Sequence, residues 1–163
     1  MRKFIITIML ALPMLAAAQK FGHVNTQEVF SQMPEVAQVK SKMDTINSQY
    51  ENQLASMNEE IQKKYQDYQA QEATMADAVK QIRQQELQEM QQRIQLFYQT
   101  AEQDIQKKQQ ELIAPVHEKM AKAIKAVGDR EGYTYIFDTS SLVHIGADAI
   151  DATPAVKKEL GIK

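Results

Sequence analysis

The chain of 163 residues contains no cysteine and no tryptophan, and only 5 glycines and 4 prolines. Without cysteine there is no disulfide framework, no thiolate nucleophile and no zinc site with cysteine ligands. So few glycines argue against an all-β sandwich or barrel formed by one chain, because such folds need many tight turns. The 19 basic and 21 acidic residues leave no basic excess, so we expect no nucleic acid among the partners.

Residues 1–18 have the pattern of a secretory signal peptide. Arg2 and Lys3 precede an apolar run, and Ala16 and Ala18 occupy the small-residue positions of a cleavage site. The apolar run is short for a permanent membrane span. We therefore expect cleavage after Ala18, export to the periplasm and no integral membrane span in the mature chain. The alternative is an uncleaved N-terminal anchor.

The 80 residues from Glu35 to Ala114 contain neither glycine nor proline and are rich in good helix formers. Their apolar residues recur at steps of three and four, the spacing of one helix face. One unbroken helix over this stretch would extend about 120 Å, and Thr74–Asp77 resembles a capping box at which a new helix begins. We therefore predict an antiparallel coiled-coil hairpin, the arm, over residues 35–116 with its tip near residues 71–77. The alternative is one continuous coiled coil between different chains.

A seam between two helices does not use every apolar residue of the arm. At 100° per residue, Leu96 falls almost on the back of the returning helix, and Leu87, Tyr98 and Ile105 fall on a flank. Such surplus apolar surface packs on another subunit or contacts a molecule outside the chain, unless it is the ordinary scatter of surface residues. The residues that we expect to contact such an outside molecule are Met57, Tyr65, Tyr68, Leu87, Leu96 and Tyr98.

The two ends of the chain, residues 19–34 and 117–163, predict a small body that contains β-strands. Residues 21–25 alternate in a way that is typical of a short strand. Thr26 is a suitable N-cap for a short helix. Pro34 then favours the start of the long helix, because proline is well tolerated in the first helical turn.

Beyond the arm, the sequence predicts the end of the returning helix and the rest of the body. Gly128 is the expected helix stop. Residues 133–137 and 142–145 predict two strands separated by a turn. A final helix is expected over residues 153–160, with Thr153 as its N-cap.

Three strands this short bury little apolar surface, so the body of a single chain would be only marginally stable. An oligomer that joins strands from several chains would supply the missing area. The candidate core residues of this shared body are Val24, Ile136, Phe137, Val143 and Val156.

Pro115 lies in the returning helix, where it removes the amide bond to residue 111 and crowds that turn. We expect a hinge at Pro115 that lets the arm pivot. The alternative is a simple helix boundary at this position.

The sequence contains no constellation that predicts catalysis. His23, His117 and His144 lack the i, i+4 pairing of a metal site. Ser140 and Ser141 lie outside any G-x-S-x-G context, and the chain has no glycine-rich phosphate loop. We therefore expect a protein that is not an enzyme, with no catalytic residues, no metal ligands and no cofactor.

An ordered set of segments resembles one known family over essentially the whole mature chain. It comprises the strand-like start at residues 21–30, the Gln-rich hairpin, and the segments at residues 115–124, 132–138 and 151–160. Together they resemble the Skp (OmpH-like) family of periplasmic chaperones. The resemblance implies an α+β, mostly α fold: a homotrimer whose subunits complete a β-containing body, each with a long coiled-coil arm. It also implies a cavity between the arms for unfolded outer-membrane proteins.

The expected function is therefore that of an ATP-independent periplasmic holdase for outer-membrane β-barrel proteins. The alternative is a structural coiled-coil spacer or adaptor of the cell envelope. One departure from the family concerns charge, since residues 41–114 carry 8 basic and 12 acidic residues. The best-known members have cationic arms linked to lipopolysaccharide, so a lipopolysaccharide site is not carried over to this net acidic arm.

Overall fold

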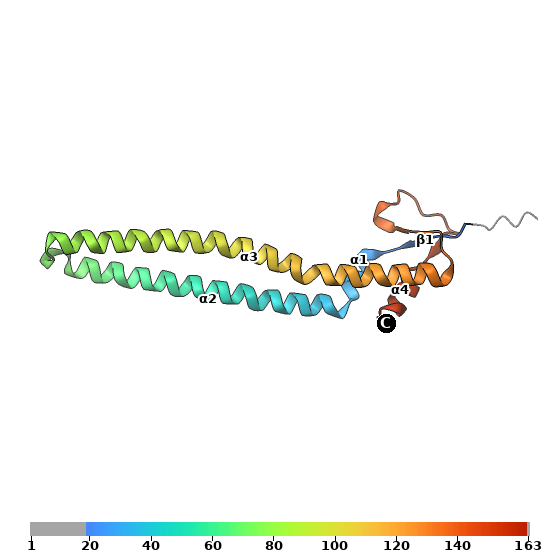
Figure 1. The fold of residues 1–163 in the computed structure, drawn as a ribbon, viewed down its shortest axis with the longest axis horizontal. Coiled ribbons are helices and arrows are strands. Elements are labelled where there is room, and N and C mark those ends of the chain that lie inside the picture. The colour runs from blue at the N-terminus through green and yellow to red at the C-terminus, as the bar shows by residue number, and fades with distance from the viewer. Residues whose placement is uncertain (1–18, 163) are drawn as a thin grey trace, which may run out of the picture. The chain divides into compact units, whose positions relative to one another are not determined.

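A computed structural model describes residues 19–162 of the chain (Figure 1). The predicted signal peptide and its cleavage after Ala18 lie outside these residues. The described residues form two compact units. We call residues 19–26 with 123–161 the body, and residues 27–122 the hairpin. Helices dominate and one small sheet is present, so the predicted α+β, mostly α fold class is confirmed. Between residues 19 and 162, no helix is both long and apolar enough to cross a bilayer.

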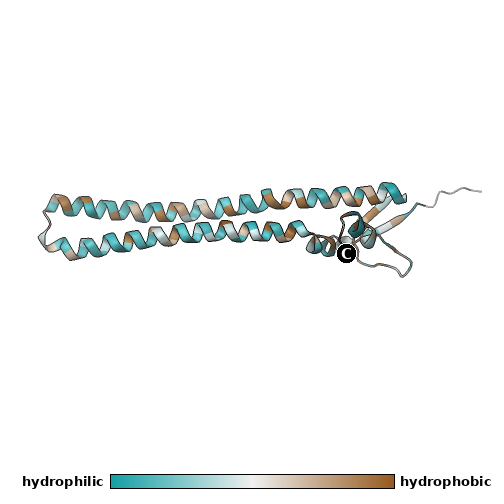
Figure 2. Ribbon diagram, turned by 90° about the horizontal axis from the view of Figure 1, so that it is seen from below, coloured by the Kyte–Doolittle hydropathy of each residue, from teal (hydrophilic) through white to brown (hydrophobic). Residues whose placement is uncertain are grey.

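Two long antiparallel helices form the hairpin. Helix α2 covers Pro34–Gln71, and helix α3 covers Asp77–Glu131 and continues into the body. The two helices run side by side and are joined by the short 3₁₀ helix η1, Glu72–Thr74 (Figures 1 and 2). The predicted hairpin is therefore confirmed, and η1 lies between its two helices, where the sequence places the tip. The short helix α1, Thr26–Gln32, precedes them.

The predicted capping box at Thr74–Asp77 is wrong. The Thr74 hydroxyl donates to the carbonyl of Gln71, 3.0 Å away, and so closes the 3₁₀ turn. Helix α3 begins later, and the carbonyl of Ala76 accepts its first bond from the amide of Val79 at 2.9 Å. A threonine hydroxyl can bond to backbone on either side, and here the tight turn uses it before the helix starts.

Polar bridges join the two helices across an apolar seam. The Tyr50 hydroxyl donates to Asp104 Oδ2 at 2.6 Å, and its ring centroid lies 5.9 Å from that of Phe97. Near the tip, the Tyr68 hydroxyl donates to Glu72 Oε1 at 2.9 Å. The same hydroxyl accepts a bond from Nε2 of Gln84 on α3, 2.8 Å away. These bridges fix the register of the helices as well as adding stability.

The end of the hairpin far from the tip is closed by denser packing. Met33, Val116 and Met120 are buried, and the Phe30 ring stacks on His117 with centroids 4.8 Å apart. The Lys119 ammonium bonds to the Glu35 carboxylate, and this bond lowers the pKa of Glu35. The buried side chains of the hairpin that serve this packing and the seam are Val29, Met33, Tyr68, Met90, Ala101, Val116 and Met120.

Helix α3 runs through Pro115 without a break. A proline inside a helix removes one backbone hydrogen bond, and α3, with 55 residues, continues on both sides of it. Pro115 is exposed to solvent, so its ring does not disturb the seam. Its role as a hinge stays a prediction.

A three-stranded parallel sheet forms the centre of the body. Strand β1, Phe21–Val24, lies between β2, Tyr135–Asp138, and β3, Ile150–Asp151. Phe21 pairs with Tyr135 and Gly22 pairs with Ile150. Parallel neighbours need a crossover connection, and between β1 and β2 the chain runs through the whole hairpin.

One face of this sheet is covered within the chain. Val24, Val127 and Val156 are almost fully buried, and helix α4, Thr153–Glu159, closes over them. The Thr153 hydroxyl accepts a bond from the amide of Asn25 at 2.9 Å. Val24 and Val156, two of the predicted core residues, are therefore buried within a single chain.

The other face of the sheet is open. Phe21, Tyr135 and Phe137 project from it, because alternate residues of a strand share a face. Their rings stack with centroids 6.0 to 6.5 Å apart, yet each side chain keeps 44 to 58% of its area exposed. Phe137 is therefore not a core residue of a single chain, and Ile136 is only half-buried.

The strand predicted at residues 142–145 is wrong. After the 3₁₀ helix η2, Thr139–Ser141, the chain is irregular until Ile150. Strand β3 takes the second edge of β1, and residues 142–145 join neither outer edge of the described sheet. Val143 is fully exposed, so an apolar run does not by itself make a strand.

Two predicted helix boundaries also differ from the structure. Helix α3 passes through Gly128 and ends at Glu131, where Gly132 adopts the left-handed φ of +71°. Glycine inside a helix is tolerated at a cost of about 1 kcal/mol. Thr153 lies inside α4 and Ala152 is the N-cap. The Thr153 amide donates instead to Asp151 Oδ1 at 2.8 Å.

Replacing Gly22 by alanine should destabilise the body. A Cβ there would lie 2.6 Å from Cε1 of Tyr133 and 3.3 Å from the carbonyl oxygen of Ile150. The Tyr133 ring lies under the Lys20 ammonium, 3.9 Å from its centroid, so it does not move freely. We expect a loss of about 1 to 3 kcal/mol in the free energy of unfolding, measured in urea. Gly146→Ala is the control, since no atom lies within 4 Å of its added Cβ. Equal losses in both variants would contradict the packing at Gly22.

Replacing Tyr68 by phenylalanine should loosen the tip of the hairpin. The change removes the hydroxyl that bonds both Glu72 and Gln84. We expect amide hydrogen exchange near the tip to become several-fold faster, while the rest of the chain is unchanged. Tyr65→Phe is the matched control, because the Tyr65 hydroxyl bonds Gln69 of the same helix. Unchanged exchange at the tip of the Tyr68 variant would show that the bridge does not hold it.

Candidate functional site

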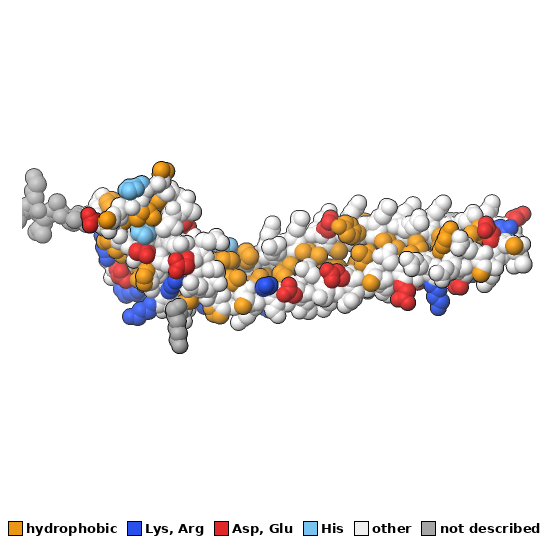
Figure 3. All heavy atoms as spheres, turned by 180° about the vertical axis from the view of Figure 1, so that it is seen from behind, with side chains coloured by type: hydrophobic (Ala, Val, Ile, Leu, Met, Phe, Trp, Pro, Cys, Tyr) orange, Lys and Arg blue, Asp and Glu red, His pale blue; other side chains and the backbone are white. Residues whose placement is uncertain are grey.

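The hairpin exposes apolar side chains beyond those in its seam. Tyr65, Val79, Ile82, Leu96 and Tyr98 each keep 43 to 64% of their area exposed. Figure 3 shows apolar side chains gathered in a row along the face of the hairpin seen there. A row of apolar side chains on a long polar pair of helices is a candidate surface for binding another molecule.

Two hollows on one side of the seam share Leu54 and Tyr98 as lining residues. The first measures about 140 Å³ and the second about 320 Å³. We call them together the Tyr98 groove. Its apolar walls come from positions that share one face of each helix. These wall residues are Tyr50 and Leu54 of α2 and Ile94, Phe97, Tyr98, Ala101 and Ile105 of α3.

Carboxylates stand at the rim of this groove. Glu51 of α2 and Glu102 of α3 line the smaller hollow, and both are exposed. The Tyr98 hydroxyl bonds to Glu102, and this bond raises the pKa of Tyr98. Within the part of the chain that the structure describes, neither Glu51 nor Glu102 forms an ion pair with a basic residue. The groove is therefore apolar at its floor and negatively charged at its rim.

The opposite side of the seam is more polar. A hollow of about 360 Å³ there is lined by Gln49, Gln53, Asp104 and Lys108 together with apolar residues. Asp104 already accepts the Tyr50 hydroxyl, and this bond raises the pKa of Tyr50. Lys108 is paired with Glu111 at 3.1 Å, and that pair raises the pKa of Lys108. These polar groups satisfy one another, so this side offers less apolar surface than the Tyr98 groove.

The structure separates the six residues predicted to bind a client. Tyr65, Leu96 and Tyr98 are exposed, and Met57 and Leu87 are half-buried. Tyr68 is only 8% exposed and its hydroxyl is used in the seam. The prediction that Tyr68 offers a free apolar surface is therefore wrong.

Sequence reasoning missed most of the groove walls. Leu54 and Phe97 belong to the helical stripes that predict a seam, yet both stay half-buried and line the groove. Ile105, which the sequence places on a flank, is also half-buried and lines it. Of the six predicted residues, Tyr98 lies in the groove, and Tyr68 and Leu87 line a separate hollow near the tip. The sequence does contain a pattern typical of a groove with an acidic rim. Leu54 lies three residues from Glu51 and Tyr98 lies four residues from Glu102, so each apolar residue shares a helix face with a carboxylate.

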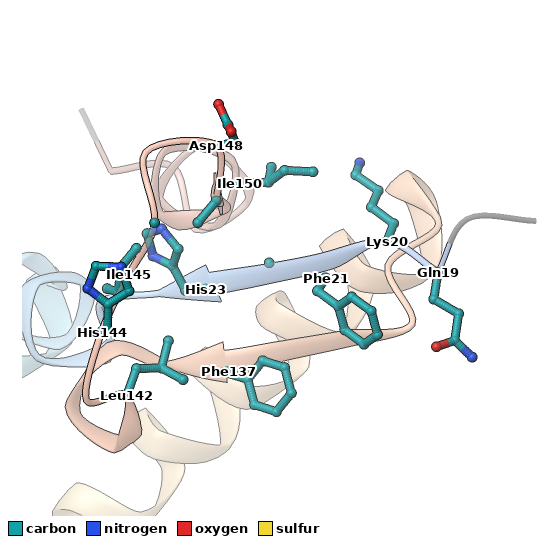
Figure 4. Close-up of a pocket in the computed structure, with 13 residues that line it drawn as sticks. Gln19, Lys20, Phe21, His23, Phe137, Leu142, His144, Ile145, Asp148 and Ile150 are labelled. Carbon is teal, nitrogen blue, oxygen red and sulfur yellow. The ribbon is translucent and has the colours of Figure 1, made fainter.

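The body carries a second hollow of about 660 Å³ (Figure 4). It lies over the open face of the sheet and is bounded by the irregular loop at residues 142–149. In Figure 4, Phe21 and Phe137 lie next to one another on adjacent strands, and His23 and His144 lie nearer the loop. The walls are mostly apolar, which fits a surface that another protein segment covers.

Two carboxylates of the body, Asp138 and Asp151, lie close to polar side chains of neighbouring segments. Nδ1 of His23 lies 3.8 Å from Asp151 Oδ1, and Asp138 accepts the Thr26 hydroxyl. That bond lowers the pKa of Asp138. Among residues 19–162, no three histidine, aspartate or glutamate side chains are placed to hold a metal ion.

Comparisons with known proteins match the chain over nearly its whole described length. The model of the family "Outer membrane protein (OmpH-like)" matches residues 20–160. The chaperone protein Skp of Pectobacterium atrosepticum is 26% identical over 144 residues, which cover 88% of this chain and 87% of that protein. Skp of Photorhabdus laumondii is 25% identical over 128 residues, or 78% of each chain.

A solved structure shares the fold. The crystal structure of an OmpH-like protein from Caulobacter crescentus CB15 matches with a TM-score of 0.78, over 87% of this chain and 83% of that one. Its sequence is 16% identical, so this match supports the architecture of body and hairpin. The family match over residues 20–160 includes both units and confirms the resemblance found in the sequence. The chain belongs to the Skp (OmpH-like) family of outer membrane proteins.

Proposed function

We propose that this chain is an ATP-independent holdase chaperone of the periplasm that binds unfolded outer-membrane β-barrel proteins and prevents their aggregation. The observation that carries this proposal is the apolar groove beside an already closed seam. The relatives named chaperone protein Skp cover most of this chain, which supports the same function. Export follows from the signal peptide expected at residues 1–18.

Apolar contact supplies the affinity in this proposal. Burial of apolar surface contributes about 25 cal/mol per Å². Half-buried methionine such as Met57 suits varied partners, because its side chain is flexible. Many weak contacts along several arms raise the local concentration of binding sites, while no client segment is fixed in one pose. Release follows when the client folds into the membrane, so the cycle needs no nucleotide.

Assembly into a trimer is part of the proposal. The open sheet face and the exposed side chains of Phe137 and Val143 offer apolar surface to another chain. Val24 is buried in its own chain, so it acts by holding β1 in place, and Ile136 is half-buried beside it. Three arms around a common axis would enclose a cavity for the client. Pro115 is our candidate for the pivot that adjusts its width.

The trimer proposal predicts that Phe137→Ser separates the chains. Phe137 is 44% exposed in a single chain, so the change removes contact between chains and leaves the body core intact. We expect light scattering to give the mass of a trimer for the unaltered protein and a smaller mass for the variant. The control is Leu96→Ser, an exposed apolar change in the hairpin. A monomeric mass for the unaltered protein would contradict the proposal.

The holdase proposal predicts that exposed apolar residues of the hairpin are needed to keep a client soluble. The triple change of Tyr65, Leu96 and Tyr98 to serine should reduce suppression of aggregation of an unfolded porin several-fold, with helicity and melting unchanged. The loss follows from removal of three exposed apolar contacts. Light scattering during dilution of the porin from urea measures the effect.

The matched control changes three exposed glutamines of the same helices, Gln66, Gln92 and Gln103, to serine. This control should suppress aggregation as well as the unaltered protein does. A spacer or adaptor protein would leave porin aggregation unchanged at every ratio. Equal activity of the two triple variants would show that clients are held elsewhere.

A further inference from the structure

The carboxylates at the rim of the Tyr98 groove favour positively charged neighbours in a bound segment, a preference that apolar contact alone does not give. We propose that this groove selects client segments in which an aromatic or large aliphatic side chain lies next to lysine or arginine. This inference rests on the proposed holdase function and states which segments of an unfolded client the hairpin grips first.

The floor of the groove has the size of one large side chain. Its smaller hollow measures about 140 Å³, and an apolar cavity of about 150 Å³ accommodates benzene. Ala101 is buried at the floor, and Phe97 and Ile105 stand half-buried around it. An inserted phenyl or branched aliphatic group would cover apolar surface that solvent now reaches.

The charge around this floor has one sign. Glu51 of α2 and Glu102 of α3 both line the smaller hollow, so each helix contributes one carboxylate to it. From residue 91 to residue 109, the positions of α3 within about 60° of Tyr98 carry no lysine or arginine. A basic side chain next to the inserted group would therefore meet two carboxylates that form no other ion pair among the described residues.

A second copy of this hairpin is a poor occupant of the groove. It would bring its own Glu51 and Glu102 against the first pair, and like charges at close range are destabilising. The whole stretch of residues 41–114 has 12 acidic against 8 basic residues, so the repulsion extends beyond the rim. A basic-flanked client segment has the complementary charge.

Affinity and selectivity have separate sources in this arrangement. Apolar insertion supplies most of the affinity, and it persists at high salt. The exposed carboxylates contribute little affinity but discriminate between neighbouring charges, and salt screens them. Clients should therefore remain bound as salt rises, while the preference for basic neighbours weakens.

The test uses the full mature protein and two unstructured peptides with several phenylalanines. The peptides differ only in the residues flanking each phenylalanine, which are lysine in one and glutamate in the other. Fluorescence anisotropy should show the lysine peptide binding roughly threefold to tenfold tighter at low salt. The preference should approach one in the variant E51Q/E102Q. It should also shrink as salt rises from about 50 to about 500 mM.

The control variant E59Q/E89Q removes the same charge, one residue per helix, at exposed positions that line none of the hollows described above. It should keep the preference. Loss of the preference in this control, or its survival in E51Q/E102Q, overturns the role of the groove rim. The variant E51Q/E102Q could also keep the peptide preference and change its solution mass. That result would show that a second copy covers the groove, and it would overturn the role of the groove rim as well.

Failure of the selectivity and failure of the holdase function give different results. A chain that suppresses porin aggregation but binds both peptides equally, or neither of them, overturns the selectivity alone. A chain that binds neither peptide and leaves porin aggregation unchanged overturns both.

Discussion

Two helices that pack only on each other can hide no more than one stripe of each. This constraint governs the hairpin. The seam of α2 and α3 closes around Met90 and Ala101 and is bridged by Tyr50 and Tyr68. Apolar residues on the flank of that stripe have no place to go within the chain. The Tyr98 groove is the result, and its half-buried walls are what a holdase needs.

The body is limited in the same way, because a single chain covers only one face of its sheet. Its three parallel strands are covered on one face by Val127 and Val156, while the other face keeps its stacked aromatic rings exposed. A parallel sheet is stable when both faces are covered. The body therefore favours contact with further protein, and assembly from several copies would provide it. Both units carry apolar surface that a single chain does not bury.

Local patterns predicted the helices well and the sheet less well. The hairpin and its tip follow from a long stretch without glycine or proline, whose apolar residues keep a helical period. The strand at Ile150–Asp151 is two residues long and gives no such signal. It pairs with β1, whereas the more apolar residues 142–145 join no strand of the described sheet. Pairing between distant segments depends on their tertiary contacts, and no local period reports those contacts.

The candidate site shows a similar division. Tyr98 was predictable because it falls off the apolar stripe. Tyr68 was also predicted to bind a client, but its hydroxyl bonds Glu72 and Gln84 and its side chain is buried. Leu54 and Phe97 looked like seam residues, but the spacing of the helices leaves them half open. The acidic rim was visible only as a net charge of the arm. Its position at the groove required both helices to be placed.

The central claim is that the flank of the hairpin, beside its closed seam, holds unfolded polypeptide. Hydroxyl-radical footprinting of the protein, with and without an unfolded outer-membrane β-barrel protein, tests it most directly. The account predicts that Leu54, Phe97 and Tyr98 become protected when the client is added. Tyr68 should stay as unreactive as before, because it is already buried. Protection confined to the body, or none along the hairpin, would contradict the account.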